Sequence, residues 1–326
     1  TDVKRRTFVT ATMGTAAAVT IPGATSNAVG TAHLEDLRAG LAALRTLDSA
    51  HGSGGVLPLA IQHLARVRRV IEMGTYPASI GQRLHLLAGQ TAAICGFLAF
   101  DSGRQEQARR FFGEALATAA MLKDENLTTQ ALSQLGLQAI YENRPRTAYD
   151  FLQAARYRAE AMGSVKLQSL IAVREARALA MMGDHGQAQG ELARGMRLLE
   201  RSGRGRPAPD WVSFYGPAEI NLAQGHLYSA AGRHSAASPY FRTSVKQLPV
   251  GLVRNRVNYR LRLAHNLALA GEADEAAAEA LAVLDELPAI SSARTRRHVT
   301  DLHRALSTID SPTTRDATEA LAARLT

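Results

Sequence analysis

Seven polar side chains stand at two fixed distances before residues that are typical of turns. The turn residues are Gly103, Asn143, Gly183, Gly232 and Gly271. Thirteen positions before a turn residue stand Gln90, Gln130, Glu219 and Asn258. Six positions before a turn residue stand Arg177, His226 and His265. Such rows can hydrogen-bond an extended peptide or a small polar molecule, so we predict a ligand-binding groove; a solvated groove without a specific ligand is the alternative.

Aromatic and acidic side chains occupy neighbouring positions before the same turn residues. The densest aromatic cluster, which includes Trp211, Phe214 and Tyr215, occurs in a sequence with only 5% aromatic residues. This cluster either fills a gap between helices or forms a rim over the groove. The candidate ligand-binding residues are Gln90, Phe97, Phe100, Asp101, Gln130, Tyr141, Arg177, Trp211, Tyr215, Glu219, His226, Asn258 and His265.

Catalysis is the less favoured interpretation of these residues. Acid and base roles could fall to Asp101, Tyr141, Glu219 and His226, but no nucleophile motif or phosphate-binding glycine loop accompanies them. The histidines form no metal-binding motif in the sequence. We therefore predict a binding protein with no catalytic residue, no metal and no cofactor.

The segments around the turn residues repeat a pattern of small and large residues. Five positions after each turn residue stands alanine, at positions 108, 148, 188, 237 and 276. Seven positions before it stand Gly96, Gly136, Ala176, Gly225 and Ala264, and nine positions after it stand Phe112, Leu152, Leu192, Phe241 and Ala280. The small residues let two antiparallel helices approach, and the large residue is expected to fill the groove between neighbouring hairpins.

This is the pattern of tetratricopeptide repeats (TPRs). The spacings between turn residues, 40, 40, 49 and 39, exceed the usual TPR period of about 34, so we expect longer helices. Residues 203–211, which are rich in proline and glycine, account for the longest spacing and are predicted to form a non-helical connector.

The repeats predict an all-α protein, specifically a right-handed TPR-like superhelical solenoid of antiparallel helix hairpins. About fourteen helices are expected, with the N-terminal pair and the last helix acting as atypical caps. Residues 31–80 are predicted to form an atypical N-terminal hairpin, residues 81–288 five TPR-like repeats, and residues 289–326 C-terminal capping helices.

Charge and cysteine content add little to this prediction. The net charge of +9 would suit an acidic partner, but the excess is mostly arginine and we give it little weight. The basic segment that contains Arg294, Arg297 and His298 is expected to be a solvated face of an amphipathic helix. The single Cys95 is expected in the core, and no run of about eighteen apolar residues predicts a membrane span.

Four segments together resemble a known family. They are LRAGLAALRTLDSAHGSGGVLPLAIQHLARVRRVIE, LAGQTAAICGFLAFDSGRQEQARRFFGEALATA, WVSFYGPAEINLAQGHLYSAAGR and RVNYRLRLAHNLALAGEADEAAAEA. Their order resembles the C-terminal TPR region of actinobacterial XRE-type helix-turn-helix transcriptional regulators. The resemblance implies a cytoplasmic, homodimeric, ligand-sensing domain that contacts DNA only through a helix-turn-helix, which we do not find in this chain.

The N-terminal segment admits two interpretations. KRRTF at residues 4–8, followed by an Ala- and Thr-rich stretch, looks like a twin-arginine export signal. The same segment resembles the linker that follows the helix-turn-helix in the XRE-type family, and we therefore predict that residues 1–30 are a linker. The alternative is an exported TPR scaffold that acts through protein–protein docking.

Overall fold

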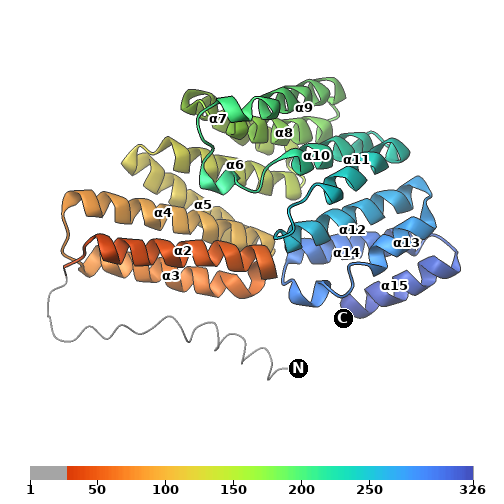
Figure 1. The fold of residues 1–326 in the computed structure, drawn as a ribbon, viewed down its shortest axis with the longest axis horizontal. Coiled ribbons are helices and arrows are strands. Elements are labelled where there is room, and N and C mark those ends of the chain that lie inside the picture. The colour runs from red at the N-terminus through yellow and green to blue at the C-terminus, as the bar shows by residue number, and fades with distance from the viewer. Residues whose placement is uncertain (1–27, 326) are drawn as a thin grey trace.

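The computed structural model describes residues 28–325, and this part of the chain forms fourteen α-helices with no strand (Figure 1). Residues 1–27 of the predicted linker lie outside the described residues. The helices are α2 (Thr31–His51), α3 (Ser53–Met73), α4 (Ala78–Asp101), α5 (Gln105–Leu122), α6 (Glu125–Tyr141), α7 (Pro145–Met162), α8 (Val165–Met181), α9 (His185–Glu200), α10 (Pro217–Ala230), α11 (His234–Lys246), α12 (Val253–Ala270), α13 (Ala273–Leu281), α14 (Ala293–Leu306) and α15 (Pro312–Leu325). The predicted all-α solenoid of helix hairpins is confirmed.

The five predicted turn residues all lie at hairpin tips. They separate α4 from α5, α6 from α7, α8 from α9, α10 from α11, and α12 from α13. Each has a positive φ, between 57° at Asn143 and 83° at Gly183. Glycine and asparagine adopt this left-handed conformation most readily, which is why these residue types mark the repeat in the sequence.

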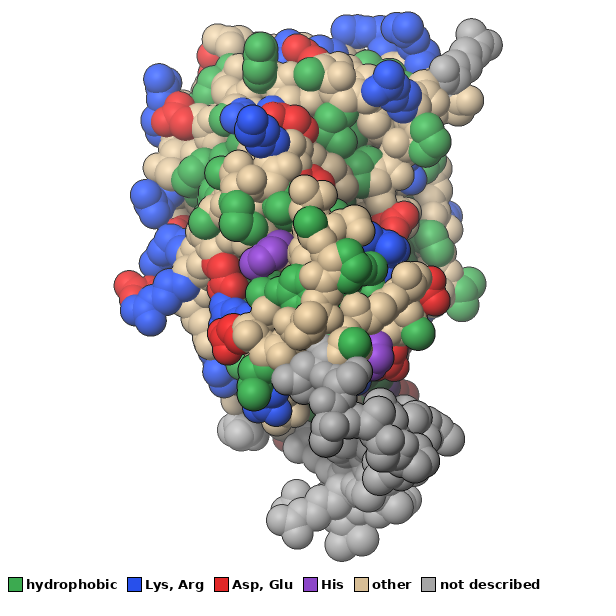
Figure 2. Space-filling view, turned by 90° about the vertical axis from the view of Figure 1, so that its left-hand side faces the viewer, with side chains coloured by type: hydrophobic (Ala, Val, Ile, Leu, Met, Phe, Trp, Pro, Cys, Tyr) green, Lys and Arg blue, Asp and Glu red, His purple; other side chains and the backbone are tan. Residues whose placement is uncertain are grey.

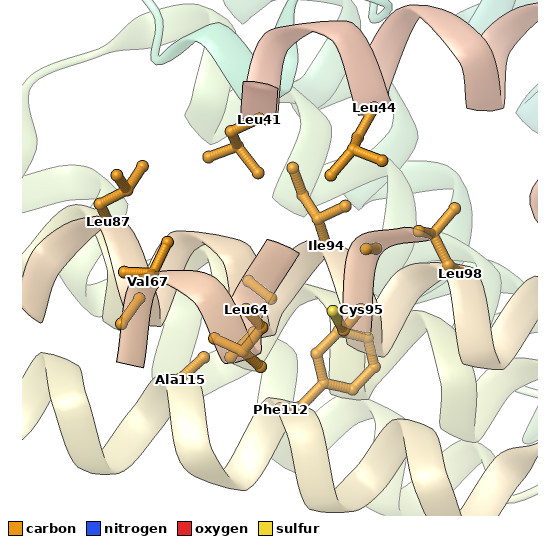
Figure 3. Packing of buried hydrophobic residues seen from close by; sticks show 14 of the residues in the cluster. Leu41, Leu44, Leu64, Val67, Leu87, Ile94, Cys95, Leu98, Phe112 and Ala115 are labelled. Atoms are coloured by element: carbon orange, nitrogen blue, oxygen red, sulfur yellow. The ribbon is translucent and has the colours of Figure 1, made fainter. Parts of the chain in front are cut away.

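Small residues allow the two helices of each hairpin to pack closely. A Cβ atom added to Gly96 on α4 would lie 2.5 Å from Cε1 of Phe112 on α5, and one added to Gly225 would lie 2.9 Å from the ring of Phe241. Figure 3 shows Phe112 beside Cys95, which is buried as expected, under leucines from the first helices. The large residue therefore covers the small residue of its own hairpin. The expectation that it also fills the groove between neighbouring hairpins stays a prediction.

This packing predicts opposite effects for two glycine substitutions. Gly96→Ala should lower the free energy of unfolding by about 1–3 kcal/mol, because the new methyl group overlaps Phe112. Gly113→Ala on α5 should raise it by about 0.5–1 kcal/mol, because Gly113 is exposed with open space around its Cα. Urea unfolding followed by circular dichroism measures both. Equal effects of the two substitutions would contradict the close contact.

The two ends of the solenoid meet. The turn between α2 and α3 pairs with the segment before α14, since Gly54 N donates to Ser291 O (2.7 Å) and Ser291 N donates to His51 O (2.9 Å). Figure 1 shows the end of α2 next to the start of α12, and these two helices are in contact. The solenoid thus curves back on its own start, and its interior is a partly enclosed cavity where a groove was expected.

Buried ion pairs join the same two ends, and we call them the closure network. Arg254 on α12 pairs with Asp48 on α2 and, at 3.7 Å, with Asp101 on α4. Arg294 on α14 pairs with Asp101 at 2.8 Å. Burial opposes the ionisation of Asp101, but Arg294 and Arg254 outweigh it and hold its pKa below the ordinary value. The segment around Arg294 is therefore not a solvated face throughout, and that expectation was wrong.

Removing the charge of Asp101 should destabilise the protein strongly. Asp101→Asn leaves Arg294 without a carboxylate and weakens the pairing of Arg254, and breaking a buried pair costs about 3–5 kcal/mol. Asp36→Asn is the matched control, because the Asp36–Arg66 pair is exposed and should contribute at most about 1 kcal/mol. Thermal and urea unfolding provide the comparison. An effect of Asp101→Asn no larger than that of the control would show that closure does not depend on this network.

The connector before α10 has the irregular backbone that its sequence predicts. Residues 203–211 contain no α-helix, as predicted; short 3₁₀ turns occur at Ser202–Arg204 and Asp210–Val212.

Among the described helices, α4 alone is long and apolar enough to cross a membrane. However, 78% of its most apolar window is buried inside the protein, so its composition fits a core helix.

Candidate functional site

The closed solenoid surrounds a central cavity of about 480 Å³. Its wall consists of one face of α4, α6, α8, α10 and α12, completed by α2, by the connector before α10 and by Arg294 of α14. The first helix of each repeat therefore lines the interior.

Most of the predicted ligand-binding residues line this cavity. They are Phe97, Gln130, Tyr141, Arg177, Trp211, Tyr215, Glu219, His226 and Asn258. Phe100, Asp101 and Gln90 line neither this cavity nor the one described next. Phe100 instead packs edge-on against Tyr141, with ring centroids 5.3 Å apart, and Asp101 belongs to the closure network.

A second cavity of about 540 Å³ adjoins the first, and we call it the histidine cavity. It contains His265, the remaining predicted residue, together with His226, His234 and His298. The two cavities share the lining residues Tyr141, Arg177, His226 and Arg262, which we call the shared wall. Among the described residues, no group of histidine, cysteine and carboxylate side chains has the arrangement of a metal site.

Tyr141 is the centre of the shared wall. One nitrogen of Arg262 donates to Tyr141 Oη (2.7 Å), and the other lies 2.8 Å from His226 Nε2. The Arg177 guanidinium lies 4.9 Å from the centroid of the Tyr141 ring. Arg294 lies 5.6 Å from that centroid, and Arg297 donates to the Tyr141 backbone oxygen at 3.2 Å. Four helices, α6, α8, α10 and α12, thus supply the shared wall, and α14 covers it.

These arginines change the ionisation of their neighbours. Burial opposes the ionisation of Tyr141, but Arg262, Arg294 and Arg177 outweigh it and lower its pKa to about 6. Burial, reinforced by Arg262 and Arg177, lowers the pKa of His226 well below its ordinary value. His226 is therefore a neutral imidazole at pH 7, able to accept from Arg262. Burial raises the pKa of Glu219 to about 7, against the opposing effect of Arg174.

The lowered pKa of Tyr141 can be measured directly. One of the eight tyrosines should ionise near pH 6, seen as an increase in absorbance at 295 nm, and Tyr141→Phe should remove this step. Tyr157→Phe, at an exposed position, is the control and should retain it. Because ionisation of Tyr141 is favoured in the folded state, stability should fall as pH decreases through 6. Ionisation of every tyrosine only above pH 9 would contradict this geometry.

The sequence analysis missed several residues of the interior. Among them are Arg174, Arg254, Arg262, Arg294 and His298, all of which line one of the two cavities. One signal could have found two of these arginines: the position nine residues before each turn residue also faces inward. That row consists of Ile94, Gln134, Arg174, Ala223 and Arg262, and all five line the central cavity.

The aromatic cluster after the connector both fills a gap and lines the cavity. Tyr215 is buried, and its hydroxyl lies 2.7 Å from Ser169 Oγ on α8. Trp211 Nε1 donates to Asn126 Oδ1 on α6 (2.9 Å), which ties the connector across the cavity wall. The cluster therefore packs between helices and also borders the cavity, so the sequence's two alternatives for it, a gap filler and a rim of the groove, do not exclude each other.

Comparison with known proteins supports the fold. No protein-family model matches the chain, and no curated protein matches its sequence. Among solved structures, it is similar to a Rap protein complexed with competence and sporulation factor, with a TM-score of 0.55 and 12% identity. The similarity covers 89% of this chain and 87% of the Rap chain. At this identity the likeness establishes the shared helical-repeat fold.

Proposed function

We propose that this chain is a ligand-binding TPR domain that takes a peptide or a small signalling molecule into the central cavity. The observation that carries the proposal is the cavity itself, which is partly enclosed, lined by apolar side chains with several polar ones among them, and built from equivalent positions of five successive repeats. Its volume of about 480 Å³ lies in the range of ligand pockets, roughly 300–1,000 Å³. The similar Rap protein, complexed with competence and sporulation factor, supports a binding role for this fold.

The proposal extends to transcription regulation through the resemblance to XRE-type regulators. In this proposal the domain is cytoplasmic and homodimeric, and it controls an attached helix-turn-helix. The closure network joins the ends of the solenoid, so a ligand that prefers one separation of these ends shifts the equilibrium between two curvatures. Each hairpin contacts mainly its neighbours, so small rotations add along the chain.

Native mass spectrometry of the full chain purified from its own host tests the proposal. We expect a copurified molecule, and calorimetry should measure its affinity for wild type and for Leu137→Trp, which places an indole in the central cavity. This substitution should weaken binding by about tenfold or more, equivalent to about 1.4 kcal/mol. Ala117→Trp is the control, because Ala117 is exposed on α5 and lines neither cavity.

Three outcomes would contradict the proposal. Equal affinity of wild type and Leu137→Trp would place the binding site elsewhere. Capture of a protein partner with no small ligand would favour the docking scaffold. Chemical conversion of the bound molecule would favour an enzyme. Circular dichroism and thermal unfolding of both tryptophan variants show whether each variant is folded.

A further inference from the structure

The interior of the solenoid carries an excess of positive charge. The arginines that line the two cavities are Arg45, Arg174, Arg177, Arg254, Arg262, Arg294 and Arg297, whereas the carboxylates are Asp48, Asp210, Glu219 and Asp301. On the face shown in Figure 2, by contrast, basic and acidic side chains are interspersed with apolar ones. The cavities thus hold part of the positive excess of the whole chain, whose net charge is +9.

Five of these seven arginines, all but Arg254 and Arg294, form no ion pair among the described residues. Three of the five, Arg174, Arg177 and Arg262, lie around Tyr141 and Glu219. Arg254 and Arg294 are neutralised by the closure network. Arg174 donates only to the backbone and hydroxyl oxygens of Ser133 (2.8 and 2.6 Å), and Arg262 contacts Tyr141 and His226. Arg177 lies over the Tyr141 ring and forms no ion pair within the described chain.

Burying an unpaired guanidinium group costs free energy, because contacts inside the protein replace little of the hydration that the group loses. Burial accordingly lowers the pKa of Arg174 and of Arg262 to about 10. The phenolate of Tyr141 supplies one negative charge, and Glu219, whose pKa burial raises to about 7, supplies part of another, so the three arginines keep an excess of positive charge. The remaining charge faces the cavities at the shared wall, where a bound molecule can reach it from either side.

We propose that the shared wall is an oxyanion site, at which Arg177 and Arg262 bind a carboxylate or phosphate group of the ligand. Guanidinium groups bind both oxyanions through paired charge-assisted hydrogen bonds. The apolar side chains of the central cavity, such as Leu137, Leu170 and Leu222, then contact the rest of the ligand. This inference rests on the proposed function and adds the chemical class of the ligand.

Occupancy of the oxyanion site also affects Tyr141. Charged or titratable groups that surround Tyr141 are Arg177 of α8, His226 of α10, Arg262 of α12, and Arg294, Arg297 and His298 of α14. A bound oxyanion competes with the phenolate for Arg177 and Arg262. Binding should therefore raise the pKa of Tyr141 and reduce tyrosinate absorbance at 295 nm at pH 7.

Small probes test the oxyanion site without knowledge of the natural ligand. N-acetyl-Leu-Leu with a free carboxylate is compared with its C-terminal amide, and phenyl phosphate with phenol, at constant ionic strength. Both anions should raise the melting temperature and reduce absorbance at 295 nm, whereas the neutral partners should do neither. The anion with the greater effect identifies whether carboxylate or phosphate is preferred.

Variants of Arg177 locate the binding. Arg177→Met should weaken binding of the anionic probes by about tenfold or more, while Arg177→Lys should retain part of the affinity, because it keeps the charge but loses the paired geometry. Arg146→Met, at an exposed position on α7, is the matched control and should bind as wild type does. Unliganded melting temperatures and circular dichroism show whether each variant is folded.

Failure of this inference is distinguishable from failure of the proposed function. Equal binding of acid and amide probes, or unchanged affinity in Arg177→Met, would overturn the oxyanion site. A neutral copurified molecule whose affinity falls in Leu137→Trp would leave the proposed function standing and remove only the charge requirement. Anionic probes that bind as expected, beside a copurified ligand insensitive to Leu137→Trp, would confirm the oxyanion site and contradict the proposed function.

Discussion

The ion pairs between the two ends of the solenoid determine what kind of site this protein has. Arg254 and Arg294, from the last helices, both reach Asp101, which ends the first helix of the first repeat. This contact, together with the backbone hydrogen bonds between Gly54 and Ser291 and between Ser291 and His51, holds the two ends of the solenoid next to each other. The inner face of the repeats surrounds a cavity in which each charge is poorly hydrated and interacts strongly with its neighbours.

The shared wall follows from this enclosure. Tyr141 lies where helices from distant repeats converge, so it is close to Arg177, Arg262 and Arg294 at once. In an exposed groove, water would screen these contacts and a tyrosine would ionise near its ordinary pKa of about 10. The position of Tyr141 in an enclosed, arginine-rich interior accounts for its lowered pKa and for the proposed preference for an oxyanion.

Two features of the sequence stabilise the scaffold that carries this site. The alanines after the turns are fully buried, and glycines such as Gly96 let the paired helices approach until Phe112 contacts the backbone of α4. The longer spacing before α10 makes room for the connector, whose Trp211 and Tyr215 close the wall between α6, α8 and α10.

The repeat could be predicted from the amino-acid sequence, because turn residues and small residues report local backbone conformation and helix contact. It placed the inner face of each first helix, which is why Gln130, Arg177, Glu219 and Asn258 were found at the cavity. It could not place Arg254, Arg294 and His298, since their positions depend on the superhelix returning to its own start. That return is the sum of small rotations over many interfaces, and no local pattern encodes it. The path of the whole superhelix therefore brings Arg294, from a predicted solvated face, into the interior and makes the predicted groove a partly enclosed cavity.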